Sequence, residues 1–261
     1  MLGSIIEALI LGIVQGLTEF IPVSSSGHLL LIGEIFSFDH TSFGFELALN
    51  LGTLLALLVY FHNDLIELAR NLYKNKDYKL VILLLVSTIP ALVVGGLFSS
   101  HIEGYFRNPF ISVSALIVVG ITMIFVDRLK GSRKINSITY GDAFFIGLAQ
   151  VVAFIPGVSR SGITIVAARF LKITNEQAAR YSFLMAIPIV SAALAKLFIS
   201  SEGASVSGSL APLLVGIFAA FISGLFAIKF MIKFLQNNGL KLFGVYRIIF
   251  AIVVLLLLFN N

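Results

Sequence analysis

A carboxylate, a hydroxyl and an imidazole lie within ten residues of one another near the N-terminus, in Glu19, Ser25 and His28. Ser25 and His28 are three positions apart, so at the start of a helix they would be neighbours able to share a hydrogen bond. A lone histidine at an apolar face is more often a core residue, but Glu19 and Ser25 beside it favour chemistry. These three side-chain types are the parts of an activated nucleophile.

Glu19 also has a polar partner one helical turn earlier in the sequence. Gln15 and Glu19 are four residues apart and share a helix face, where both could reach one ligand or cation. The alternative is that Gln15 and Glu19 only cap or bridge neighbouring helices. Ionisable groups in apolar segments cost about 2.5–3.5 kcal/mol each on insertion scales, which makes them functional candidates. Glu7 and Glu46 are further carboxylates of this kind, whereas Lys196, Lys229 and Arg247 are expected to snorkel or to bridge helices.

Two clusters of serine and glycine resemble each other, and each follows a Phe-Ile-Pro sequence. Each cluster ends where a short helix is expected to begin, so its hydroxyls can cap that helix and its N–H groups can bind an anion. Arg160 adds a planar donor set that suits phosphate oxygens. We therefore predict a phosphate site built from two helix N-termini. Its expected residues are Ser24, Ser26, Gly27, Ser159, Arg160, Ser161 and Gly162.

The elements that must position these groups are transmembrane helices. Of the 261 residues, 58% are hydrophobic and only 12% are charged, whereas a soluble domain has about 25% charged residues. The net charge of +5 lies in short runs between apolar segments, which argues against a nucleic-acid partner. The absence of cysteine excludes disulfides and thiolate chemistry. Six stretches are long enough to span a bilayer: 44–62, 80–98, 110–127, 180–199, 211–232 and 242–259.

Two other apolar regions, 4–36 and 141–171, are each interrupted by one of the Pro, Ser and Gly clusters. Irregular backbone at membrane depth is tolerated only where protein buries it or where it lines a wet cavity. We therefore expect two re-entrant helical hairpins, each followed by three spans. The chain then forms a single membrane domain, 1–261, of two inverted repeats, about 1–130 and 138–261, with the working site at their interface.

The distribution of Lys and Arg predicts the orientation of the chain. Loops 63–79 and 128–142 each carry four Lys or Arg residues. In contrast, loops 99–109 and 200–210 together hold only Arg107. Positive loops mark the cytoplasmic side. We expect both termini and the first hairpin on the outer side, and the second hairpin to enter from the cytoplasm.

Two motifs of the sequence resemble those of a known family. Gln15-Gly-Leu-Thr-Glu19 followed by Pro22-Val-Ser-Ser-Ser-Gly-His28 is similar to the first signature of the undecaprenyl pyrophosphate phosphatases, also called bacitracin-resistance proteins. Pro156-Gly-Val-Ser-Arg-Ser-Gly-Ile-Thr164 is similar to their second signature. The likeness covers essentially the whole chain, including 45–52 and 181–188. Gln15 stands where the family has Glu or Gln, which leaves one carboxylate in this pair.

The resemblance implies an all-α integral membrane enzyme with six transmembrane helices and two re-entrant hairpins. It implies hydrolysis of undecaprenyl diphosphate to undecaprenyl phosphate, which recycles the lipid carrier for peptidoglycan and other wall polymers in the bacterial plasma membrane. It also implies a divalent cation, Mg²⁺ or Ca²⁺, which we place on Gln15 and Glu19, and it adds Thr164 to the phosphate site. An inverted-repeat transporter or a flippase of a polyprenyl phosphate is the rival interpretation.

Within this resemblance we expect Ser25 to be the nucleophile and His28 its base, with Glu19 orienting His28 or holding the cation. His28 as the nucleophile is the alternative. Arg160 is expected to neutralise the phosphates, and the site to open outward. The partners are then a polyprenyl diphosphate and membrane lipids, and homodimerisation is left open.

Overall fold

The structure is a computed structural model that describes residues 2–36, 38, 43–106, 109–199 and 210–260. Throughout these residues the chain is helical, apart from turns, connecting segments and one isolated bridge between Arg133 and Ile173. The all-α membrane fold predicted from the composition is confirmed. The helices are α1 (Leu2–Phe20), α2 (Ser25–Phe36), α3 (Phe43–Tyr60), α4 (His62–Arg70), α5 (Lys79–Phe106), α6 (Pro109–Val126), α7 (Tyr140–Val152), α8 (Arg160–Phe170), α9 (Asn175–Ile199), α10 (Leu210–Asn237) and α11 (Lys241–Asn260), with short turns η1 (Asn71–Asn75) and η2 (Ile135–Ser137).

Six described helices are long and apolar enough to cross a membrane: α1, α5, α6, α9, α10 and α11. The stretch expected at 44–62 forms α3, which passes this test only together with the segment that follows it, at a bend of 64°. Beyond the bend, α4 carries Asp64, Glu67 and Arg70 and has no buried residue. In contrast, α1 was expected to be one arm of a hairpin, yet its 19 residues are also long enough to span.

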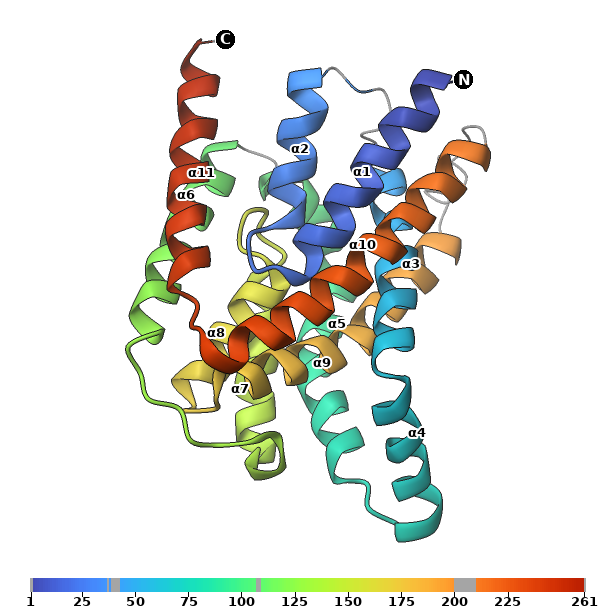
Figure 1. Ribbon diagram of the computed structural model, residues 1–261, viewed down its shortest axis with the longest axis vertical. Helices are drawn as coiled ribbons and strands as arrows, with labels where there is room; N and C mark the ends of the chain where they lie inside the picture. The colour runs from blue at the N-terminus through green and yellow to red at the C-terminus, as the bar shows by residue number, and fades with distance from the viewer. Residues whose placement is uncertain (1, 37, 39–42, 107–108, 200–209, 261) are drawn as a thin grey trace.

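Two helical hairpins enter the molecule from opposite ends (Figure 1). The start of α1, the end of α2 and the end of α11 lie at one end, and the start of α7 and the end of α8 lie toward the other. The connecting segments 21–24 and 153–159, which we call the first and second tip, meet in the interior. Each tip is non-helical backbone held inside the protein, as expected for a chain interrupted at membrane depth.

The order of elements is similar in both halves of the chain: a hairpin is followed by α3, α5 and α6 in the first half and by α9, α10 and α11 in the second. The packing is also paired, since α1 and α3 lie against α10, α7 and α9 lie against α5, and α6 lies against α11. The helices α1 and α10 approach closely, because Gly12 and Gly16 face Gly216 and Gly224 at a distance that leaves no room for a Cβ atom. That the segments 1–130 and 138–261 are inverted copies of one unit remains a prediction.

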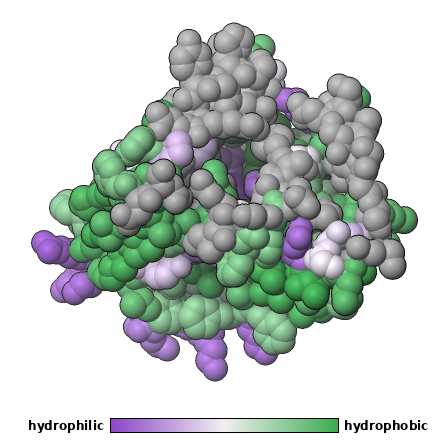
Figure 2. Space-filling view, turned by 90° about the horizontal axis from the view of Figure 1, so that it is seen from above, coloured by the Kyte–Doolittle hydropathy of each residue, from purple (hydrophilic) through white to green (hydrophobic). Residues whose placement is uncertain are grey.

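The outer surface matches a membrane environment. Seen from the end that holds both termini, apolar residues form most of the visible flank, and hydrophilic residues are visible in a hollow toward the centre (Figure 2). Large side chains such as Leu85, Phe226 and Leu256 are more than half exposed on the spanning helices. In water this would be a liability, but against lipid it is the surface expected of a multi-pass protein.

Candidate active site

A cavity of about 270 Å³ lies where the first hairpin meets α3, α8 and α9. The polar lining residues come from α1, α2, α3 and α8, and most of the apolar ones come from α9. Such a division suits a ligand with a charged head and a hydrocarbon chain. The lining residues are Gln15, Glu19, Ser25, Ser26, Leu29, Glu46, Leu47, Asn50, Arg160, Ile189, Val190 and Ala193.

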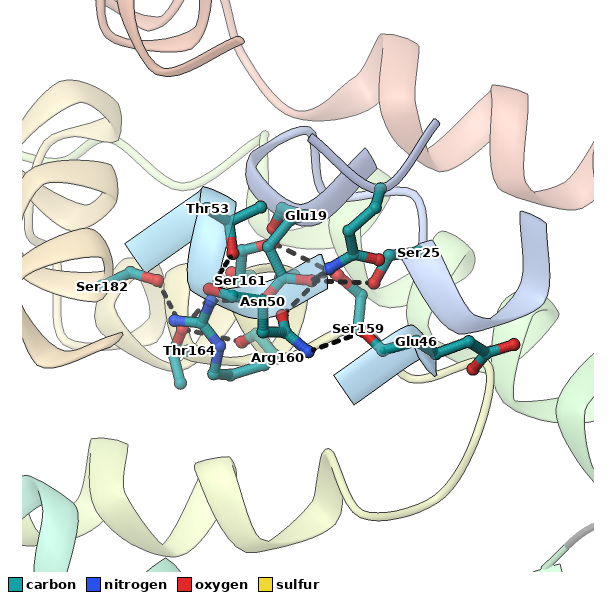
Figure 3. A network of polar contacts seen from close by, with 12 residues as sticks. Glu19, Ser25, Glu46, Asn50, Thr53, Ser159, Arg160, Ser161, Thr164 and Ser182 are labelled. Carbon is teal, nitrogen blue, oxygen red and sulfur yellow. Dashed lines mark hydrogen bonds and ion pairs between the residues drawn. The ribbon is translucent and has the colours of Figure 1, made fainter. Parts of the chain in front are cut away.

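Glu19 is the centre of the polar wall and connects the two hairpins (Figure 3). Its Oε1 accepts a hydrogen bond from Arg160 Nη2 at 2.7 Å, and its Oε2 accepts one from Ser25 Oγ at 2.8 Å. Gln15 Nε2 donates to the same Oε2 at 3.1 Å and to Asn50 Oδ1 at 2.9 Å. The side chains of Glu19 and Arg160 are only 13% and 14% exposed, so this ion pair is partly desolvated and held in one geometry.

The two tips position Ser25 and Arg160 in the same way. Ser24 and Ser159 each adopt a left-handed backbone, with φ of 79° and 70°, and the next residue in each case begins a short helix. A non-glycine residue in this region is strained by roughly 1–2 kcal/mol. The reversal of the backbone directs Ser25 and Arg160, one from each hairpin, into the same cavity.

Several of the residues expected to bind phosphate instead brace the tips. Ser161 Oγ donates to the Glu19 carbonyl at 3.0 Å, and Thr164 Oγ1 bonds the Arg160 carbonyl at 2.8 Å and Ser182 Oγ at 2.7 Å. Ser159 Oγ caps α8 by accepting from the Gly162 N–H. Of the predicted phosphate set, the structure brings Ser26 and Arg160 to the cavity wall, and it does not bring there Ser24, Gly27, Ser159, Ser161, Gly162 or Thr164.

The structure corrects the expected hydrogen bond between Ser25 and His28. His28 Nδ1 bonds the Ser24 carbonyl at 2.8 Å and Nε2 bonds Tyr246 Oη at 2.7 Å, so both ring nitrogens are engaged elsewhere. The ring also stacks on Phe250, with centroids 4.1 Å apart. The cause is α11, whose aromatic residues pack on the face of α2 that carries His28 and turn the imidazole away from the cavity.

The metal site expected at Gln15 and Glu19 can be tested against the donors that surround it. Among the described residues no group of three or more His, Asp or Glu side chains is placed to hold a metal ion. The cavity does offer the carboxylates of Glu19 and Glu46 and the amide oxygens of Gln15 and Asn50. These are hard oxygen donors, and Mg²⁺ is commonly bound by one or two carboxylates together with substrate phosphates. The residues therefore fit a cation that binds with its substrate.

Sequence reasoning missed Asn50 and the apolar lining from α9, and it named Glu46 as a candidate without assigning it a role. Glu46 and Asn50 are four residues apart on α3, the same spacing as Gln15 and Glu19 on α1. The repetition of such a polar pair in an apolar helix was a signal that could have identified α3 as a second source of polar residues in the cavity. The apolar wall from α9 has no such signal, because Ile189, Val190 and Ala193 look like any lipid-facing residues in the sequence.

Comparison with known proteins gives one consistent result. The family model for bacitracin resistance protein BacA matches residues 8–253. The undecaprenyl-diphosphatase of Geotalea daltonii is 44% identical over 267 residues and 98% of each chain. That of Thermodesulfovibrio yellowstonii is 40% identical over 260 residues and 99% of each chain. That of Idiomarina loihiensis is 37% identical over 262 residues, or 97% of this chain and 99% of its own.

Proposed function

This chain belongs to the bacitracin resistance protein BacA family, and we propose that it hydrolyses undecaprenyl diphosphate to undecaprenyl phosphate and inorganic phosphate. The observation that carries the proposal is the position of Glu19, which bonds the hydroxyl of Ser25 and the guanidinium of Arg160 at once. A nucleophile, a base and a cation for phosphate are thereby assembled from both hairpins at one cavity. Phosphoryl transfer depends mainly on such positioning and charge stabilisation.

Ser25 is the nucleophile in this proposal and Glu19 is its base. Ser25 Oγ attacks the terminal phosphorus, the bond from that phosphorus to the bridging oxygen breaks, and undecaprenyl phosphate leaves. Glu19 accepts the serine proton, which its 2.8 Å hydrogen bond already prepares, and passes it to the leaving oxygen. Water then attacks the phosphoserine, Glu19 takes a proton from that water, and Ser25 Oγ is reprotonated as inorganic phosphate departs.

Arg160 stabilises the negative charge of the phosphates. Its Nη2 bonds Glu19, whereas its buried Nη1 has no hydrogen-bond partner in the described part of the chain. A buried donor without a partner costs about 1–3 kcal/mol, and a phosphate oxygen would satisfy it. The N-termini of α2 and α8, which begin at Ser25 and Arg160, add positive potential at the same place.

A divalent cation, Mg²⁺ or Ca²⁺, would be held by oxygens of Glu19 and Gln15 from α1 and of Asn50 from α3. When bound, it would supply further positive charge to the diphosphate. The residues of the chain itself orient the reacting groups, because Gln15 fixes Glu19 and Asn50 fixes Gln15. The apolar wall formed by Leu47, Ile189, Val190 and Ala193 suits the first isoprene units of the substrate.

We propose that the cavity opens to the outer side of the plasma membrane. The first hairpin enters from the end that holds both termini, and the Lys- and Arg-rich segments 63–79 and 128–142 lie toward the opposite end (Figure 1). Positive loops favour the cytoplasmic side. The loops expected on the outer side include 107–108 and 200–209, which fall outside the described residues. A diphosphate released by wall synthesis on the outer face would then reach the site directly.

Release of inorganic phosphate from undecaprenyl diphosphate by the purified protein in detergent tests the proposed function. The expected result is stoichiometric phosphate and undecaprenyl phosphate. Ser25→Ala should release neither product, and Ser132→Ala, in an exposed loop, is the matched control that should behave as the parent. If the folded parent protein binds the lipid but releases no phosphate, the proposal fails and a carrier of polyprenyl phosphates becomes the better interpretation.

A further inference from the structure

Arg247 on α11 is a buried cation that contacts both tips. Its side chain is 0% exposed, so it does not snorkel. Nη1 donates to the Pro22 carbonyl of the first tip at 3.1 Å. Nη2 donates to the Val158 carbonyl of the second tip at 2.9 Å and to the Gly157 carbonyl, and Nε donates to the Leu116 carbonyl on α6 at 3.4 Å. One guanidinium thus joins two tips that are more than a hundred residues apart in the sequence.

A buried cation of this kind is costly unless it has a specific task. In the described part of the chain its hydrogen bonds go to carbonyl oxygens and it forms no ion pair with a carboxylate. Removing such a charge from water costs several kcal/mol, and an apolar side chain would fill the same volume at lower cost. The tips, however, are non-helical backbone whose carbonyls need donors, and the planar fork of arginine supplies up to five.

The tip carbonyls that Arg247 holds lie one or two residues before the two left-handed serines. Val158 precedes Ser159, and Pro22 lies two residues before Ser24. Each of these serines in turn places the next residue, Arg160 or Ser25, in the cavity. Strained backbone of this kind persists only where its surroundings fix it. Arg247 therefore holds the tip carbonyls, and the tips in turn position Ser25 and Arg160, which both bond Glu19.

We propose that Arg247 is a positioning residue that sets the separation of the two tips, and with it the geometry of Ser25 and Arg160 on Glu19. The inference rests on the proposed function for its effect on rate, but its structural part does not. Tyr246 and Phe250, on the same helix, hold His28 of α2 and so anchor the first hairpin alone. Arg247 also bonds the tip of the second hairpin, so α11 contacts and supports both hairpins.

Arg169 provides a matched control, because it is also a buried arginine that bonds carbonyls. Its side chain is 3% exposed, and its guanidinium donates to the Ile173 and Leu129 carbonyls at the base of α8, away from the tips. Arg247→Lys and Arg169→Lys both keep the charge and lose the planar fork. Both are expected to lower the unfolding temperature in detergent, whereas only Arg247→Lys should change the site.

For the folded Arg247→Lys protein we expect kcat to fall by about 100-fold, the order of loss that a small misplacement of reacting groups causes, with KM within about threefold. Folded Arg169→Lys should keep kcat within about twofold. An equal kcat for both variants would reduce Arg247 to a stability residue and overturn the proposal. Arg247→Gln, which is neutral and keeps two donors, serves as the second variant if the lysine protein does not fold.

A distance measurement separates this inference from the proposed function. Spin labels on cysteines introduced at Ile21 and Ile155, one in each tip, report tip separation by electron paramagnetic resonance in a chain that has no other cysteine. We expect one narrow distance distribution in the parent and in Arg169→Lys, and a broadened or shifted distribution in Arg247→Lys. An unchanged distribution would overturn the positioning role even if the parent is active. If the parent releases no phosphate but the distribution broadens, the proposed function fails and the positioning role stands.

Discussion

Glu19 and Arg160 are 141 positions apart in the sequence, yet their side chains form an ion pair of 2.7 Å at the point where the two hairpins meet. The pair gives the cavity a carboxylate and a guanidinium whose positions depend on each other. Because Glu19 also accepts the Ser25 hydroxyl, a change at any of the three side chains must disturb the other two. Their effects on activity should consequently be non-additive.

Glu19→Gln should remove the proposed base while keeping a side chain of nearly the same size. We expect kcat to fall by about 10²–10⁴-fold, the usual contribution of a positioned base, with the protein still folded. The exposed Glu67→Gln on α4 is the control and should match the parent. The measurement is phosphate release at saturating lipid. If Glu19→Gln retains more than about a tenth of the parent rate, Glu19 does not act as the base.

Ser25 and His28 should differ in a phosphate-trapping experiment. Denaturation of the enzyme in detergent at neutral pH, with substrate labelled in its terminal phosphate, should trap an acid-stable phosphoserine in the parent and in His28→Ala, but no phosphoenzyme in Ser25→Ala. His28→Ala should mainly lower stability, since it removes the bond to Tyr246 and the stacking on Phe250. A phosphoenzyme that persists in Ser25→Ala and disappears in His28→Ala would make the histidine the nucleophile instead.

The sequence predicts the hairpins and the spans because their signals are local. A proline and a serine cluster inside an apolar run mark a tip, and about twenty apolar residues mark a span. The direction of the His28 ring has no local signal, because Tyr246, which turns it, lies 218 residues away. Arg247 is similar: its position near the start of α11 predicts a residue that snorkels or bridges helices, and only the arrangement of three segments shows that it holds both tips.

Ser159 should respond differently to glycine and to alanine. Alanine removes the hydroxyl that caps α8 and keeps the left-handed strain, so it should destabilise by about 0.5–2 kcal/mol. Glycine also removes the cap but relieves a strain of roughly 1–2 kcal/mol, so its net effect should be close to zero. Unfolding in a denaturing detergent measures both. The same pair of changes at the exposed Ser132 should be nearly neutral, and an alanine at 159 as stable as glycine would contradict the strain argument.

Gln15→Glu should make activity more dependent on a divalent cation. The amide of Gln15 donates to Glu19, and a carboxylate in its place would repel Glu19 unless a cation lies between them. We expect a lower rate than the parent at micromolar Mg²⁺ and recovery at millimolar Mg²⁺, measured as phosphate release against cation concentration. Gln15→Ala is the control, since it removes the amide without adding charge. A Gln15→Glu rate that does not change with Mg²⁺ would argue against a cation at this pair.

The orientation of the chain can be tested with single cysteines, because the natural sequence contains none. Gly3 is exposed near the start of α1 and has nothing within 4 Å of an added Cβ. Ser132 is exposed in the segment between α6 and α7, toward the opposite end of the molecule (Figure 1). In intact cells a membrane-impermeant maleimide should label Gly3→Cys and not Ser132→Cys, and both should be labelled once the membrane is permeabilised. Labelling of Ser132→Cys alone in intact cells would place the first hairpin, and the cavity with it, on the cytoplasmic side.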